Sequence, residues 1–209
     1  MRRAASPRQP TKRRKAALPY DIIVVGCSLG GMQALQVILA GLPDDFCIPI
    51  AVVQHRHRRS DEGLPAFLRR SSKMAVVDVQ DKQWIKPGTV YLAPANYHLL
   101  VEKGVFNLSV DDAVRHSRPS VDVLFESAAD AYGACVIGLV LTGSNIDGTR
   151  GAERIKRRGG IVLAQDPATA EAPEMPQGVI DAGVVDQILP LQDIAPYLDE
   201  KCRVTRERA

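Results

Sequence analysis

Three loops of this chain carry a serine, a histidine and an aspartate, the residue types of a nucleophile, its general base and the group that orients the base. Ser28 lies in a Gly-Cys-Ser-Leu-Gly-Gly segment, His55 in Gln-His-Arg-His, and Asp147 in a glycine-rich segment. Each loop follows a short apolar run that is typical of a buried strand. Because sites in open α/β sheets form beyond the carboxyl ends of parallel strands, we expect the three side chains to meet there.

The loop around Ser28 has three interpretations. The pattern Gly26-x-Ser28-x-Gly30 matches a hydrolase nucleophile elbow, a degenerate dinucleotide-binding loop, or a glycine turn that serves only helix–sheet packing. A nicotinamide-binding unit usually ends its second strand with an acidic residue that holds the ribose, whereas Gln54 and His55 stand here. This favours His55 as the base for Ser28. The arginines that follow keep a reductase with a phosphate-bearing cofactor open as a weaker alternative.

Asp147 also has two interpretations, and they are compatible. As an orienting carboxylate it would accept a hydrogen bond from the imidazole of His55 and fix its tautomer. As an N-cap it would begin the helix that follows it. The chain order Ser28, His55, Asp147 differs from the usual order of α/β-hydrolases, so a triad here implies a different fold.

Strands and helices alternate along the chain, which predicts an α/β fold with a doubly wound, mostly parallel sheet flanked by helices. A less regular β region near residues 89–110, with a turn at Lys103-Gly104, predicts a small antiparallel hairpin region. The other predicted strands are 21–26, 48–53, 74–79, 136–141, 161–164 and 184–188. The predicted helices begin at about 31, 60, 120, 149, 174 and 191, and the second of them is expected to end near residue 71.

The charge distribution argues against a nucleic-acid-binding protein. The formal net charge is +3, from 27 basic and 24 acidic residues. Residues 1–20 hold seven basic and no acidic residues, and residues 199–209 hold four basic and three acidic ones, so 16 basic and 21 acidic residues remain between them. A nucleic-acid-binding domain would usually carry its positive charge on the folded body.

The composition, 45% hydrophobic and 24% charged, is typical of a globular domain. We predict a basic, disordered tail over 1–19, one catalytic domain over 20–198 and a C-terminal tail over 199–209. No apolar run approaches the roughly 20 residues that span a bilayer, and the N-terminus lacks the apolar stretch of a secretion signal. We therefore expect no membrane insertion and a cytoplasmic location. The four cysteines have no metal-type spacing and are expected to be free thiols.

Several blocks in register make the sequence similar to one known family. They are 23–31, 53–55, 91–94 with His98, 118–125 (Arg-Pro-Ser-Val-Asp-Val-Leu-Phe), 141–148 and 164–166. Over nearly all of residues 20–198 the chain resembles the catalytic domain of the chemotaxis protein-glutamate methylesterases, the CheB family.

The resemblance implies an esterase that removes methyl groups from glutamate γ-methyl esters on the cytoplasmic helices of methyl-accepting chemoreceptors. Many members also deamidate receptor glutamines. It implies that Ser28 is the nucleophile, His55 the base and then the acid, and Asp147 the orienting carboxylate, with no metal or organic cofactor. The implied substrate and oxyanion region comprises Leu29, Gly30, Gly143 and Ser144.

Three positions depart from the family pattern. Leu29 stands where the family usually has Thr or Ser, and Ser144 and Asn145 replace the Met and Gly of Thr-Gly-Met-Gly-x-Asp-Gly. These changes bear on rate and substrate choice. They keep open a second interpretation, a weakly active or inactive member that acts as a receptor-binding signalling module.

Family members typically carry a receiver domain before the esterase domain, whereas only the basic segment 1–20 precedes the first predicted strand. Taken as complete, the chain is expected to be a stand-alone esterase whose regulation falls to a separate response regulator or kinase. The basic segment would then be an inert leader, or would hold the enzyme near an acidic receptor array or the anionic inner membrane surface.

Overall fold

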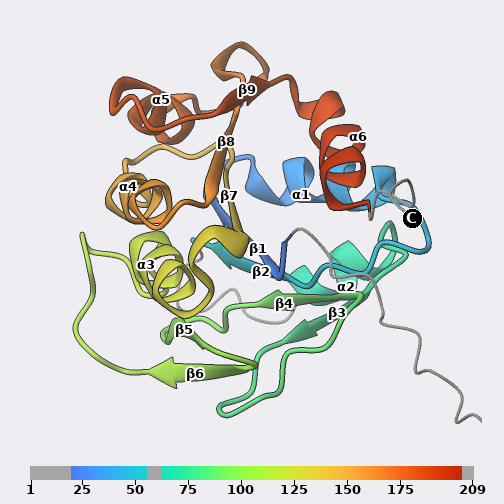
Figure 1. Cartoon of the computed structure of the whole chain (residues 1–209), viewed down its shortest axis with the longest axis vertical. Coiled ribbons are helices and arrows are strands. Elements are labelled where there is room, and N and C mark those ends of the chain that lie inside the picture. The colour runs from blue at the N-terminus through green and yellow to red at the C-terminus, as the bar shows by residue number, and fades with distance from the viewer. Residues whose placement is uncertain (1–19, 56–62, 204–209) are drawn as a thin grey trace, which may run out of the picture.

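The computed structural model describes residues 20–55 and 63–203. Its centre is a sheet of seven parallel strands in the order β3-β4-β2-β1-β7-β8-β9 (Figure 1). The strands are β1 Ile22–Cys27, β2 Ile50–Gln54, β3 Ala75–Asp78, β4 Thr89–Leu92, β7 Val136–Val140, β8 Ile161–Gln165 and β9 Gln187–Leu189. The predicted tail 1–19 and the last part of the predicted tail 199–209 lie outside the described residues.

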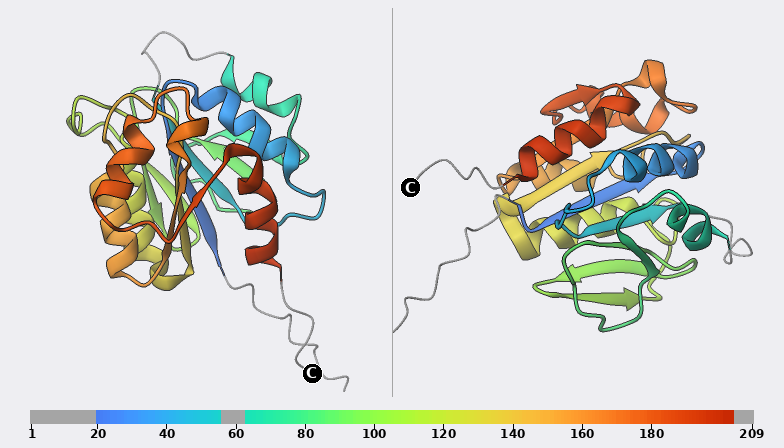
Figure 2. Two further views of the ribbon diagram at one scale, coloured as in Figure 1. Left: turned by 90° about the horizontal axis from the view of Figure 1, so that it is seen from above. Right: turned by 90° about the vertical axis from the view of Figure 1, so that its right-hand side faces the viewer.

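Helices cover both faces of this sheet, as the view from above shows (Figure 2). On one face lie α1 (Gly31–Gly41), α2 (Leu64–Arg69) and α6 (Leu191–Cys202). On the other lie α3 (Val121–Tyr132), α4 (Thr149–Arg157) and α5 (Glu174–Asp181), together with an antiparallel hairpin of β5 (His98–Glu102) and β6 (Val105–Ser109). The 3-10 turns Gly133–Cys135 and Pro167–Thr169 complete the described structure.

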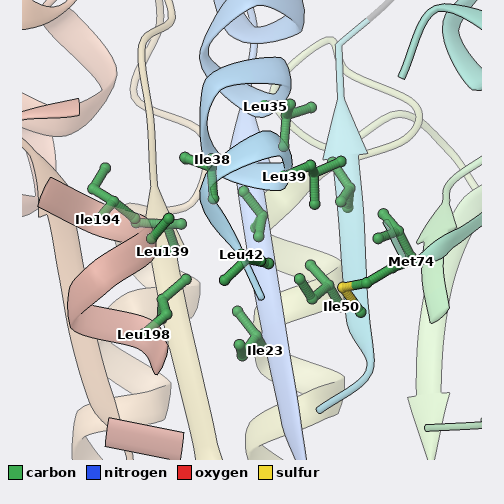
Figure 3. Close-up of a cluster of buried hydrophobic side chains, with 14 of the residues drawn as sticks. Ile23, Leu35, Ile38, Leu39, Leu42, Ile50, Met74, Leu139, Ile194 and Leu198 are labelled. Atoms are coloured by element: carbon green, nitrogen blue, oxygen red, sulfur yellow. The ribbon is translucent and has the colours of Figure 1, made fainter. Parts of the chain in front are cut away.

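The alternation of side chains along β1 explains why the sheet has two cores. Successive residues of a strand point to opposite faces, so Ile23 packs among the side chains of α1, α2 and α6, whereas Ile22 packs among those of α3, α4 and α5. Figure 3 shows the first core, in which Leu39 of α1 and Leu198 of α6 lie over Ile23 and its neighbours in the sheet. All six residues of β1 are buried, as expected for a central parallel strand.

The doubly wound parallel sheet and the small hairpin were both predicted, but one strand of the predicted β region belongs elsewhere. Thr89–Leu92 pairs in parallel with β3 on one side and β2 on the other, whereas the antiparallel hairpin is made by β5 and β6 alone. Val90, Tyr91 and Leu92 are buried, and burial on both faces is the property of a strand inside a parallel sheet.

The second predicted helix is shorter than expected. Its described part, α2, begins at Leu64 with Pro65 in its first turn, and it ends at Arg69. The predicted start at residue 60 lies outside the described residues. In the same way, β9 is confined to Gln187–Leu189 rather than 184–188.

The strand order places the predicted reactive loops together. β1 pairs with β2 on one side and with β7 on the other, all in parallel. The strands β2, β3 and β4, which follow β1 in the sequence, lie on one side of β1, whereas β7, β8 and β9 lie on its other side. The loops after β1, β2 and β7 therefore leave the same edge of the sheet at the point where the order reverses, which is where α/β sheets bind their ligands.

Candidate active site

Ser28 sits in a tight turn between β1 and α1. Its N–H donates to the carbonyl of Thr142 over 2.9 Å, and its carbonyl accepts the N–H of Gly31 over 2.9 Å. Gly30 has φ +77°, a left-handed conformation that glycine adopts without strain, and it caps the N-terminus of α1. The turn thus places Ser28 just ahead of a helix N-terminus, as the nucleophile-elbow interpretation requires.

Gln54 ties the Ser28 turn to the neighbouring strand end. Its buried amide nitrogen donates to the carbonyl of Ser28 over 2.7 Å and to the carbonyl of His55 over 3.1 Å. Its amide oxygen accepts from the thiol of Cys27 over 3.0 Å. The sequence drew attention to Gln54 because it is not acidic and because it lies in a family block, but its role in joining two site backbones was missed.

His55 and Asp147, which are far apart in the sequence, are in direct contact. The His55 Nε2 atom lies 2.8 Å from Asp147 Oδ2. The imidazole is 12% exposed and the carboxylate 1% exposed. The structure therefore brings together the predicted base and the predicted orienting carboxylate.

Asp147 receives four hydrogen bonds, three of them from the start of α3. Oδ1 accepts from the Ser120 hydroxyl over 2.9 Å and from the Asp122 N–H over 3.0 Å. Oδ2 accepts from the Val121 N–H over 2.7 Å, beside its contact with His55. Burial alone would raise the pKa of Asp147, but the hydrogen bonds from His55 and the α3 amides outweigh it, and the pKa lies below its usual value.

The expectation that Asp147 caps the following helix is wrong. The N-cap of α4 is Gly148, which makes no side-chain capping bond. The α4 amides are held instead by Asp122, whose Oδ1 accepts from the Gly148 N–H over 3.0 Å and from the Gly151 N–H over 2.8 Å. The loop carboxylate thus caps α3, and the carboxylate of α3 caps α4.

Asp122 contrasts with Asp147 in its electrostatics. Burial raises its pKa above the usual value, and the charge of Asp147 adds to this, against the hydrogen bond from the Gly151 N–H. Its Oδ2 atom lies 3.4 Å from the Arg115 Nε atom, whose side chain is 46% exposed. Asp122 was noticed in the sequence only as part of a family block, because nothing local reveals that it reaches the next helix.

Asn145 contacts His55 on the side opposite to Asp147. Its Nδ2 atom lies 3.2 Å from His55 Nδ1, and its Oδ1 atom accepts the Asp147 N–H over 3.0 Å. Asn145 is one of the positions that depart from the family pattern. The sequence indicated a change there that bears on rate and substrate choice, but it did not indicate a contact with the imidazole.

The predicted oxyanion region divides into two groups. The N–H of Gly143 donates to the Ala172 carbonyl over 2.9 Å, so it is already engaged. The N–H groups of Leu29, Gly30 and Ser144 donate to no acceptor within residues 20–55 and 63–203. Gly143 has a packing role instead, since a Cβ there would come within 2.9 Å of Ser28 Cβ.

Ser28 and His55 line one open cavity of about 400 Å³. Its other lining residues are Leu29, Gly30, Met32, Gln33, Gln54 and Glu171. The side chain of Leu29 is 54% exposed and that of Ile146, next to Asp147, is 50% exposed. The described part of the chain joins Ser28 Oγ to the imidazole by no hydrogen bond. Ser28 and His55 therefore line the same cavity without a hydrogen bond between their side chains.

Other kinds of site receive no support from the described structure. Within residues 20–55 and 63–203, no group of three or more His, Cys, Asp or Glu side chains is arranged to hold a metal ion. None of the helices in those ranges combines the length and apolarity needed to cross a bilayer. Gln54, at the position where a nicotinamide-binding unit usually holds the ribose, is buried and bonded to the Ser28 turn.

A serine, a histidine and a carboxylate at adjoining strand ends of an α/β sheet are an arrangement typical of the hydrolase class. A sequence model of the CheB methylesterase family matches residues 23–198. The chain belongs to the CheB methylesterase family.

Individual relatives agree with this assignment. A Leptospira interrogans protein, to which protein-glutamate methylesterase and protein-glutamine glutaminase activities are assigned by name, is 46% identical over 177 residues, which are 84% of this chain and 92% of that protein. The protein-glutamate methylesterase FrzG of Myxococcus xanthus is 37% identical over 92% of this chain and 58% of its own length. The crystal structure of the Thermotoga maritima CheB methylesterase catalytic domain matches with a TM-score of 0.83 and 37% identity, over 87% of this chain and 98% of that one.

Proposed function

We propose that this chain is a serine hydrolase that removes methyl groups from glutamate γ-methyl esters on the cytoplasmic helices of chemoreceptors. The observation that carries the proposal is the 2.8 Å contact between His55 Nε2 and Asp147 Oδ2 beside the cavity that Ser28 lines. The names of both relatives described above refer to glutamate methyl esters in proteins. Family membership favours this function over the nicotinamide-dependent reductase.

The contacts of His55 favour Nδ1 as the nitrogen that acts as the base. The Asp147 carboxylate accepts a hydrogen bond from Nε2–H, so the ring nitrogen of neutral His55 that carries no proton is Nδ1. In the first step Ser28 Oγ attacks the ester carbonyl carbon and its proton passes to Nδ1. Asp147 stabilises the imidazolium that forms.

Backbone N–H groups stabilise the oxyanion of the tetrahedral intermediate. The candidates are the N–H groups of Leu29, Gly30 and Ser144, which have no acceptor among the described residues. The first two lie at the N-terminus of α1. Methanol leaves with the proton from Nδ1, and a water molecule then releases the glutamate carboxylate from Ser28. A glutamine substrate would follow the same route with ammonia as the leaving group.

Methanol release from a methylated receptor fragment tests this proposal. We expect Ser28→Ala to lower the rate by about 10³-fold or more, because the nucleophile is lost. Ser71→Ala is the matched control: its hydroxyl lies after the end of α2 and, among the described residues, accepts a hydrogen bond from Gln36 alone. Equal rates for Ser28→Ala and the unmodified protein would overturn the proposed mechanism.

A further inference from the structure

Asn145 places an amide group against the ring nitrogen that the proposed mechanism needs. The orientation of this amide follows from its other contact, because Oδ1 accepts the Asp147 N–H over 3.0 Å. The Nδ2 group, with its two hydrogens, is therefore the end that lies 3.2 Å from His55 Nδ1. A primary amide nitrogen can only donate, so Nδ1 must be the acceptor in this contact.

The contacts on the two sides of the imidazole agree with each other. On one side Asp147 accepts from Nε2, and on the other Asn145 donates to Nδ1. Together they fix neutral His55 in the Nε2–H tautomer. They also occupy the Nδ1 lone pair, which would otherwise receive the proton of Ser28.

We propose that Asn145 is a positioning residue that caps Nδ1 of His55 in the free enzyme and restrains the triad until the amide is displaced. The inference rests on the proposed function. It is consistent with the absence of a hydrogen bond between Ser28 Oγ and the imidazole among the described residues. The same amide favours the Nε2–H tautomer that the mechanism requires, and it also occupies the Nδ1 lone pair that must receive the Ser28 proton.

The surroundings of Asn145 suggest how a protein substrate relieves the restraint. Its neighbours Ser144 and Ile146 are both exposed, and the Ile146 side chain is 50% exposed. A helix that covers the cavity would contact this loop, whereas a small ester that enters the cavity need not. The cap therefore restrains reaction with small molecules more than reaction with a protein substrate.

Two substitutions of Asn145 separate this role from a purely structural one. Asn145→Ala removes the cap and the acceptor for the Asp147 N–H. Asn145→Asp keeps an oxygen for that N–H but puts a carboxylate against Nδ1, where it favours a protonated ring nitrogen. If Asn145 only shaped the loop, Asn145→Ala would be the more damaging change and Asn145→Asp nearly silent. The proposal predicts the reverse order.

The first measurement is the rate at which a neutral p-nitrophenyl phosphonate ester labels Ser28. In this reaction the Oγ–P bond forms, p-nitrophenolate leaves, and the hydroxyl proton passes to Nδ1. We expect Asn145→Ala to label about two- to tenfold faster than the unmodified protein, the effect of one lost hydrogen bond. We expect Asn145→Asp to label more slowly. Unchanged or slower labelling of Asn145→Ala would overturn the capping role.

The second measurement is independent of activity. The ¹⁵N chemical shifts of the His55 ring should identify Nδ1 as an unprotonated acceptor in the full chain, with a downfield change in Asn145→Ala as the amide is removed. A ring with protonated Nδ1 in the unmodified protein would overturn the proposal. Labelling that persists in Ser28→Ala would instead contradict the proposed function, so the two failures are distinguishable.

Discussion

Two buried aspartates meet at the start of α3 and have opposite electrostatics. Asp147 is saturated by hydrogen bonds, and its pKa is lowered. Asp122 binds two amides of α4 through one oxygen, and its other oxygen lies 3.4 Å from the Nε atom of the half-exposed Arg115. Both carboxylates are buried and both cap a helix, so the hydrogen-bond partners of a carboxylate, rather than its burial alone, decide the direction in which its pKa shifts.

The largest expected effect is on activity and distinguishes Asp147 from its neighbour. Asp147→Asn replaces the acceptor of the His55 Nε2–H with a group that can also donate, so the tautomer is no longer fixed. We expect methanol release to fall by about 10³- to 10⁴-fold, with the fold retained by circular dichroism. A loss below tenfold would mean that Asp147 has no orienting role.

The second effect is on stability and belongs to Asp122. Asp122→Ala leaves the buried N–H groups of Gly148 and Gly151 without their acceptor. We expect the free energy of unfolding, measured by urea titration, to fall by about 2–4 kcal/mol. The rate per folded molecule should fall much less than in Asp147→Asn. A loss of rate per folded molecule as large as that of Asp147→Asn would contradict the different roles assigned to the two aspartates.

The pH dependence of stability should have opposite signs for the two groups. Asp147, whose pKa is lowered, contributes stability above the unfolded value near 4, and this is lost as the pH falls through the folded value. Asp122, whose pKa is raised, contributes stability below that value, and this is lost as the pH rises through its folded value. We expect the free energies of unfolding of Asp147→Asn and Asp122→Asn, measured between about pH 3 and 7, to diverge from that of the unmodified protein in opposite directions. The same pH dependence in both variants would contradict the opposite pKa shifts.

A smaller effect concerns the support of Asp147. Ser120→Ala removes the 2.9 Å hydrogen bond to Oδ1 and leaves the contact with His55 in place. We expect a loss of about 1 kcal/mol of unfolding free energy and a rate reduction of no more than about tenfold. Ser120→Thr, which retains the hydroxyl, is the control, and equal defects in both variants would point to packing rather than to the hydrogen bond.

The smallest effect concerns the cation beside Asp122. Arg115 is half exposed and its Nε atom is 3.4 Å from Oδ2, so solvent screens the pair. Arg115→Gln should lower the free energy of unfolding by less than about 1 kcal/mol. The difference should shrink as salt is added. A loss as large as that of Asp122→Ala would show that the ion pair, and not the helix cap, holds this carboxylate.

The sequence was sufficient for the features that depend on strand ends. Short apolar runs followed by glycine or polar loops located Ser28, His55 and Asp147 at strand ends. Because the strands are parallel, their carboxyl ends lie at one edge of the sheet. A β region that begins near residue 89 was predicted, but the parallel partners of β4 were not, because the pairing of Thr89–Leu92 depends on burial of both its faces.

The contacts between distant segments could not be predicted from the sequence. Nothing near Asp147 indicates that it caps α3 rather than α4, since the choice depends on how two helices pack against each other. The direction of the Asn145 amide depends on a single backbone N–H. The engagement of the Gly143 N–H depends on the carbonyl of Ala172, which a separate loop supplies.

The reversal of strand order between β1 and β7 has a consequence for assembly. Ser28 and His55 come from the first half of the sheet and Asp147 from the second, and the halves are hydrogen-bonded to each other in the sheet through β1 and β7. Cleavage between β6 and α3 would put the nucleophile and the carboxylate on separate polypeptides. Recovery of esterase activity on mixing the two pieces would then report the docking of one half-sheet on the other, because the site is complete only when β1 and β7 are paired.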